Sequence, residues 1–171
     1  MLNAVVAALV LIVNFIFQST LLQLVEIRGV IPDTMIIIIV SYALLRGQNT
    51  GMAVGFAAGL IYDIFFGNSL GFYALIGIIT GLVCGMSSKT FYRENYVMPV
   101  LLSFISNMVV GMVVYITGFL FKNDYNVFYY ILNVILPQSV YTGVAAILIY
   151  RTLYSINKKV EKKEREKRRV F

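Results

Sequence analysis

The sequence has no histidine, no tryptophan and a single cysteine, Cys84. These absences exclude a disulfide within the chain and zinc sites built on cysteine and histidine. Charged residues are also scarce, at 13% of the 171 residues, whereas hydrophobic residues make up 60%. This composition offers too little polar surface to cover a water-soluble core, and it therefore predicts an integral membrane protein.

The hydropathy pattern predicts an all-α membrane protein, a bundle of six transmembrane segments. The segments are 3–25, 31–46, 51–66, 70–87, 97–121 and 128–152. The third and fourth are short and rich in glycine, and at about 1.5 Å per residue they barely cross a hydrocarbon core of about 30 Å. They are either short spans in a locally thinned membrane or a re-entrant hairpin.

The positive charge is concentrated at the C-terminus. The net charge of +6 is carried by residues 151–171, where nine Lys or Arg stand against three Glu. We divide the chain into a transmembrane domain at 1–152 and a basic tail at 153–171. We expect the tail to extend the last helix, because Glu161 and Arg165, and likewise Glu164 and Arg168, are helix-supporting pairs.

The distribution of Lys and Arg predicts that both termini are cytoplasmic. In that orientation the cytoplasmic side collects Arg46, Lys89, Arg93 and the nine basic residues of the C-terminal segment. The outer side keeps only Arg28 and Lys122. We therefore predict a multi-pass membrane protein.

Two series of glycines repeat at every fourth residue, one in each short segment: Gly51, Gly55 and Gly59, then Gly77, Gly81 and Gly85. This spacing places each series on one face of a helix, where the absent side chains allow close backbone approach. The connecting stretch 67–71, which ends at Gly71, is turn-like. We expect a tightly packed antiparallel hairpin; a partner-binding surface is the alternative.

Two acidic residues lie in or beside apolar segments. Asp63 follows Gly59 at the same spacing of four residues. A carboxylate inside a membrane segment suggests a functional site. Arg28 is a candidate partner for it, and capping of the turn at Asn68 and Ser69 is the alternative. Pro32 and Asp33 are typical of the first turn of a helix, where an acid complements the helix dipole.

Polar residues also share faces of the long helices. Asn14 and Gln18 do so in the first segment and Ser103 and Asn107 in the fifth, and Pro137 predicts a kink in the sixth. Hydrogen bonds between helices explain these positions, and a small-molecule cavity is the alternative.

The basic residues of the tail have three possible roles. A juxtamembrane cluster of Lys and Arg attracts anionic lipids, and it can also set the topology or dock a cytoplasmic protein. We do not expect nucleic-acid binding from so short a tail. The residues are Lys158, Lys159, Lys162, Lys163, Arg165, Lys167, Arg168 and Arg169.

The stretch from Pro32 to Leu75 resembles the MreD family of rod shape-determining proteins. The resemblance rests on these elements: Pro32-Asp33, an apolar run to Arg46-Gly47, Gly51, Gly55-Phe56, Gly59-Leu60, Asp63, Leu70-Gly71 and Ala74-Leu75. It covers about a quarter of the chain; elsewhere the similarity is in hydropathy, in size and around Asn14 and Gln18.

The resemblance implies a non-enzymatic scaffold for bacterial cell elongation and lateral peptidoglycan synthesis. Members of the family work beside MreC, which is the expected direct partner, the actin-like MreB, the RodA glycosyltransferase and a class B penicillin-binding protein. We expect no cofactor and no metal.

The family is also similar in fold to the vitamin-binding subunits of energy-coupling-factor transporters. A solute-binding subunit is therefore the alternative function, and Ala4 and Ala8 could then dock a transporter partner. The residues themselves favour a scaffold, since only Asp33 and Asp63 could serve catalysis and both have structural explanations.

Overall fold

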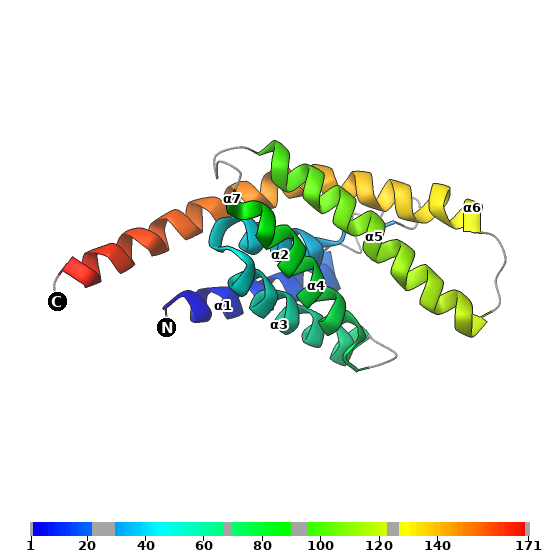
Figure 1. Cartoon of the computed structure of the whole chain (residues 1–171), viewed down its shortest axis with the longest axis horizontal. Helices are drawn as coiled ribbons and strands as arrows, with labels where there is room; N and C mark the ends of the chain where they lie inside the picture. Colours follow the sequence, from blue (N-terminus) through cyan, green and yellow to red (C-terminus); the bar gives the residue numbers. More distant parts are fainter. Residues whose placement is uncertain (1, 22–29, 67–69, 90–95, 123–126, 170–171) are drawn as a thin grey trace.

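A computed structural model describes residues 2–21, 30–66, 70–89, 96–122 and 127–169, and the regular elements of these residues are helical (Figure 1). In chain order they are α1 (Leu2–Ile16), the π-helical turn η1 (Phe17–Leu21), α2 (Thr34–Arg46), α3 (Gln48–Phe66), α4 (Phe72–Met86), the 3₁₀ turn η3 (Ser87–Lys89), α5 (Val97–Lys122), α6 (Val127–Tyr130), the π-helical turn η4 (Ile131–Ile135) and α7 (Leu136–Arg169).

Six apolar helices account for the six predicted segments, and the all-α membrane bundle is thereby confirmed. Three are long and apolar enough to cross a membrane: Gln48–Phe66, Val97–Gly118 and the continuous stretch Phe128–Val160. Three are shorter: Val5–Thr20, Thr34–Arg46 and Phe72–Met86. Helix α3 begins three residues before the third predicted segment and has 19 residues, so it is not one of the short helices, contrary to the prediction. The shortest of the six is α2, with 13 residues.

Helix α2 lies at the centre of the bundle. Every residue from Thr34 to Leu45 is buried, and a helix that is apolar all round needs neighbours on every side. One side, with Ile38 and Tyr42, packs in a cluster with residues of α1, α3 and α7. The other, with Ile36 and Val40, packs in a cluster with Cys84 of α4 and with α5. The other helices are therefore arranged around α2.

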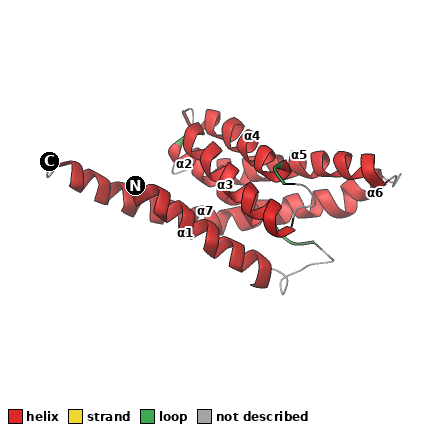
Figure 2. Ribbon diagram, turned by 90° about the horizontal axis from the view of Figure 1, so that it is seen from below, coloured by secondary structure: helices red, strands yellow, loops and turns green. Residues whose placement is uncertain are grey.

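The helices alternate in direction, and α1 begins at the end of the bundle where α7 finishes (Figures 1 and 2). Only Gly47 separates α2 from α3, and its φ of 88° lies in the left-handed region that favours glycine. The reversal at Gly47 places the end of α2 and the start of α3 at the same end of the bundle as the start of α1, and α7 extends beyond this end (Figure 1). At the opposite end lie the starts of α2 and α4.

Helix α7 is the longest element, and it passes residue 152 without a break. Leu153, Asn157 and Val160 are buried, so this part of the helix still packs against the bundle. Near its start, the π-helical turn Ile131–Ile135 comes just before Pro137. Proline has no backbone N–H and therefore removes one hydrogen bond from the helix. The π-helical turn lies where this hydrogen bond is missing.

The central position of α2 predicts a large effect of shortening its side chains. Ile37 is 0% exposed, whereas Ile147 on the outer face of α7 is 46% exposed. We expect Ile37→Ala to lower the free energy of unfolding by about 2–5 kcal/mol, because it leaves a cavity. The matched variant Ile147→Ala should cost much less. Thermal unfolding in detergent, followed by circular dichroism, measures both, and equal losses would contradict the central placement of α2.

Candidate functional site: a glycine-packed hairpin closed by a buried carboxylate

Helices α3 and α4 form an antiparallel hairpin with direct backbone contact. A Cβ atom added at Gly55 would overlap the carbonyl group of Gly77, and one added at Gly77 would overlap that of Gly55. One turn away, a Cβ at Gly51 would stand 2.7 Å from the carbonyl oxygen of Gly81. Real Cβ atoms do not approach backbone so closely, so these positions accept only glycine at the present helix separation.

The same close contact continues to both ends of the hairpin. Gly59 faces the backbone of Tyr73 and Ala74, and Gly85 faces the backbone of Gln48. All six glycines of the two series are buried. The tightly packed antiparallel hairpin predicted from their spacing is therefore present, and the two series face each other.

Asp63 closes the hairpin at its loop end. Its side chain is 2% exposed. One carboxylate oxygen, Oδ2, accepts hydrogen bonds from the backbone N–H groups of Gly71 and Ala74, and Oδ1 accepts one from Tyr73, each at 3.0 Å. These donors lie at the cap position and in the first turn of α4, where backbone N–H groups have no acceptor within the helix. Asp63 of α3 therefore caps α4.

The residue at the cap position of α4 explains why the acceptor comes from another helix. Gly71 occupies this position with a φ of 98° and has no side chain to accept a hydrogen bond. A carboxylate placed there also complements the partial positive charge at a helix N-terminus. The candidate partners suggested by the sequence, Arg28 and the turn at Asn68 and Ser69, lie outside the described residues.

Asp33 caps α2 in the ordinary way. Its Oδ1 accepts a hydrogen bond from Ile36 N at 3.1 Å, and its own N–H donates to Thr142 Oγ1 of α7 at 3.0 Å. Pro32 is buried and precedes the cap. It therefore lies one residue before the cap, and the sequence-based prediction that it belongs to the first helical turn is wrong.

Polar residues of the long helices make several of the predicted hydrogen bonds between elements. Thr34 Oγ1 donates to Gln18 Oε1 at 3.0 Å, and Asn107 Nδ2 donates to Ser139 Oγ at 3.1 Å. Asn133 instead donates to Tyr129 O within its own helix. Sequence reasoning missed two further polar residues of α7: Thr142, which binds Asp33, and Asn157.

Asn157 joins the second half of α7 to the central helix. Its Oδ1 accepts a hydrogen bond from Arg46 Nε, at the end of α2, at 2.6 Å. A buried face at Tyr150, Leu153, Asn157 and Val160 has helical spacing, and this spacing is the signal that could have identified Asn157 in the sequence.

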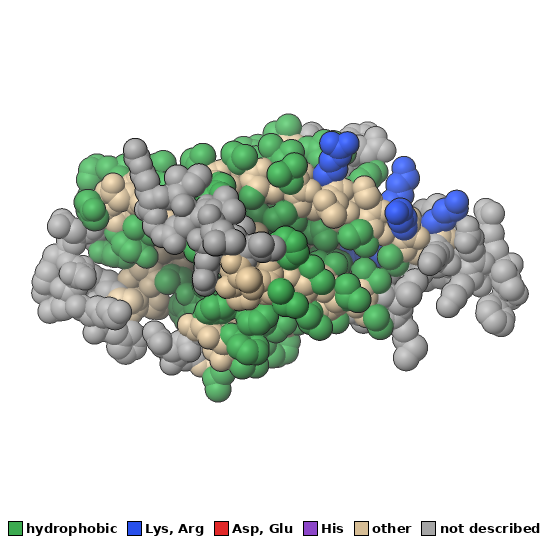
Figure 3. Space-filling model, turned by 180° about the vertical axis from the view of Figure 1, so that it is seen from behind, with side chains coloured by type: hydrophobic (Ala, Val, Ile, Leu, Met, Phe, Trp, Pro, Cys, Tyr) green, Lys and Arg blue, Asp and Glu red, His purple; other side chains and the backbone are tan. Residues whose placement is uncertain are grey.

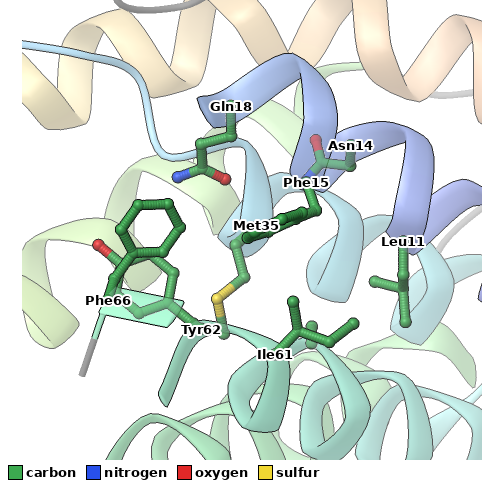
Figure 4. Close-up of a pocket in the computed structure, with 9 residues that line it drawn as sticks. Leu11, Asn14, Phe15, Gln18, Met35, Ile61, Tyr62 and Phe66 are labelled. Atoms are coloured by element: carbon green, nitrogen blue, oxygen red, sulfur yellow. The ribbon is translucent and has the colours of Figure 1, made fainter. Parts of the chain in front are cut away.

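A small cleft lies between α1, α2 and α3. Asn14, Gln18, Met35 and Tyr62 are among its lining residues (Figure 4). Its free space is about 20 Å³, enough for roughly one water molecule. A second cleft, beside Arg46 and Asn157, has about 10 Å³. Neither cleft has the size of a vitamin pocket, which would need a few hundred Å³.

The basic side chains that the structure describes gather toward the end of the bundle beyond which α7 extends (Figure 3). Lys158, Lys159 and Lys162 are exposed. For the remaining tail residues the structure describes the helical backbone to Arg169, and their side chains lie outside the described part: Lys163, Arg165, Lys167, Arg168 and Arg169.

The comparison with known families extends over nearly the whole chain. A family model described as rod shape-determining protein MreD matches residues 1–160. The chain belongs to the MreD family. Membership assigns it a role in determining rod shape as a membrane protein of that machinery. No curated protein and no solved structure matches the chain. The match ends at Val160, which is also the last buried residue among the described side chains of α7.

The triple cap by Asp63 makes a residue-specific prediction. We expect Asp63→Asn to destabilise the protein by about 1–3 kcal/mol, because the amide brings a donor where acceptors are needed and removes the charge. Hydrogen exchange at the N–H groups of Tyr73 and Ala74 should accelerate. Asp33→Asn is the control, since Asp33 caps with one oxygen and the amide oxygen of asparagine can still accept the N–H of Ile36, so protection there should be kept. Unchanged protection of Tyr73 and Ala74 would contradict the cap.

The glycine contacts predict opposite outcomes for one substitution at two sites. Gly55→Ala places a Cβ against the Gly77 carbonyl group and should lower the unfolding temperature clearly. Gly118→Ala is the matched control, because nothing lies within 4 Å of a Cβ there. Alanine at that helical position should be neutral or stabilising by up to about 1 kcal/mol. Thermal unfolding in detergent compares the two, and a Gly55→Ala variant as stable as Gly118→Ala would exclude the close contact.

Proposed function

We propose that this protein is a non-enzymatic scaffold of the cell-elongation machinery that binds MreC. Through MreC it would support lateral peptidoglycan synthesis together with MreB, RodA and a class B penicillin-binding protein. The observation that carries the proposal is the family match over residues 1–160. The membrane orientation that goes with it has both termini in the cytoplasm, as the distribution of Lys and Arg favours.

The chemistry of the two described carboxylates supports a scaffold. Asp33 and Asp63 each accept hydrogen bonds from backbone N–H groups at a helix start. Carboxylates used in this way hold helices in place. Asp33 and Asp63 would otherwise be the candidates for catalysis or solute binding, and they instead contribute to the architecture.

The rigidity of the α3–α4 hairpin supports a role as a platform for the MreC contact. Glycine contacts fix the separation of the two helices, and the Asp63 cap fixes the start of α4 relative to the end of α3. A transmembrane partner binds mainly through close packing, because lipid is as apolar as the helices themselves. Such packing requires a surface whose shape is maintained, and the hairpin provides one.

Co-purification with MreC tests the proposal. MreC should be recovered with the tagged wild-type protein from its native membranes in mild detergent. Gly55→Leu should reduce the recovery at least severalfold, because leucine forces α3 and α4 apart, whereas the control Gly118→Leu should leave it unchanged. Cell shape should follow the same order, with rods lost only for Gly55→Leu.

Three outcomes would count against the proposal. Absence of MreC from the wild-type preparation would exclude a stable scaffold complex. Full recovery with Gly55→Leu, in a preparation where thermal unfolding shows the expected destabilisation, would show that the hairpin does not support the contact. Recovery of ATPase subunits with a bound vitamin would favour the solute-binding alternative.

A further inference from the structure

One face of α7 changes from apolar to basic along its length. Val144 and Leu148 are 58% and 72% exposed, and Arg151, Lys158 and Lys162 are exposed further along. At 100° per residue, these five positions share one side of the helix. Leu153, Asn157 and Val160 occupy the opposite side and are buried. The face therefore points away from the protein, first with aliphatic side chains and then with cations.

The neighbours of α7 show at which depth the face becomes basic. Asn157 and Val160 line one cleft together with Val6 of α1 and Arg46 of α2. This part of α7 therefore lies beside the beginning of the first span and the end of the second. We therefore place the boundary between the hydrocarbon core and the lipid headgroups at this level, because the apolar helix α1 begins there and α2 ends there. Lys158 and Lys162 lie at this boundary.

Arg151 extends the basic part of the face toward the apolar part. It follows Leu148 by three residues, which is about 4.5 Å along a helix. A long arginine side chain at this depth reaches the headgroup layer while its stem stays beside the hydrocarbon. In the sequence the same spacing continues beyond Lys162 at Arg165 and Arg169.

The charge around this face is favourable for an anion. Arg46, Arg151, Lys158, Lys159 and Lys162 lie at this end of the bundle. The carboxylates whose side chains the structure describes, Asp33 and Asp63, lie at the other end and already accept hydrogen bonds from helix starts. The described side chains at this end thus give a positive potential facing the membrane surface.

We propose that this face of α7 binds an anionic phospholipid. An acyl chain lies along Val144 and Leu148, and the phosphate group binds Arg151, Lys158 and Lys162. The continuity of the aliphatic and basic parts favours a lipid over a cytoplasmic protein, because one lipid molecule has both an acyl chain and a charged headgroup. The proposal does not depend on the proposed binding of MreC.

Native mass spectrometry of the purified full-length protein tests the lipid site. The protein is titrated in detergent micelles with phosphatidylglycerol and, separately, with phosphatidylcholine of the same acyl chains. We expect preferential adducts with phosphatidylglycerol that weaken as the ionic strength rises. Equal adducts with the two lipids would overturn the proposal without any variant.

A pair of double variants tests which face binds. Lys158→Gln with Lys162→Gln removes two charges from the proposed face, and affinity should fall by about fivefold per charge. Lys159→Gln with Lys163→Gln is the matched control, with the same spacing and charge loss but a rotation of about 100° around the helix. The control should keep most of the affinity.

The other outcomes of these experiments would overturn the proposal. Equal losses in the two double variants would mean that net charge alone attracts the lipid, and no loss in either would place the lipid elsewhere; both results overturn the proposal. Unchanged lipid adducts, together with loss of a co-purified cytoplasmic protein only from the Lys158 and Lys162 variant, would assign the face to a protein instead.

Discussion

The architecture depends on how the first N–H groups of α2 and α4 are satisfied. At about 1.5 Å per residue, helices of 13 and 15 residues are shorter than a hydrocarbon core of about 30 Å, so that their ends lie within or close to it. Unpaired backbone groups are costly there because water is scarce. Asp33 and Asp63 supply the acceptors. The expense of burying a carboxylate is thus offset by the donors of two short helices.

The cap at α4 and the glycine contacts reinforce each other. Asp63 can reach Tyr73 and Ala74 because α3 and α4 lie against each other, and Gly59 permits this approach at the same turn. The cap in turn sets the axial position of α4, which aligns Gly77 with Gly55 and Gly81 with Gly51. A change at either feature therefore disturbs the other. This coupling is the physical basis for treating the hairpin as one platform.

The parts of this structure that could be predicted from the sequence are those with a local period. Spacing of four residues identified the hairpin, and the hydropathy pattern identified six helices. The central position of α2 could not be predicted, because an unbroken apolar run such as Ile36–Val40 carries no period that indicates its neighbours. Contacts between residues far apart in the sequence could not be predicted either, such as those of Arg46 with Asn157 and of Asp33 with Thr142. The partner of Asp63 was missed for another reason, since the acceptor of a cap usually belongs to the helix that it caps.

The enclosure of α2 has a consequence for how the protein is made. Four of the five helices that surround α2 follow it in the chain, so they are absent when the ribosome has just completed it. A segment of 13 residues is too short to span a bilayer stably by itself. Its final place is therefore reached only after the later helices have been inserted and have closed around it. Biogenesis of this protein thus ends with the assembly of its centre, and a chain truncated before α7 would leave the second segment without its permanent surroundings.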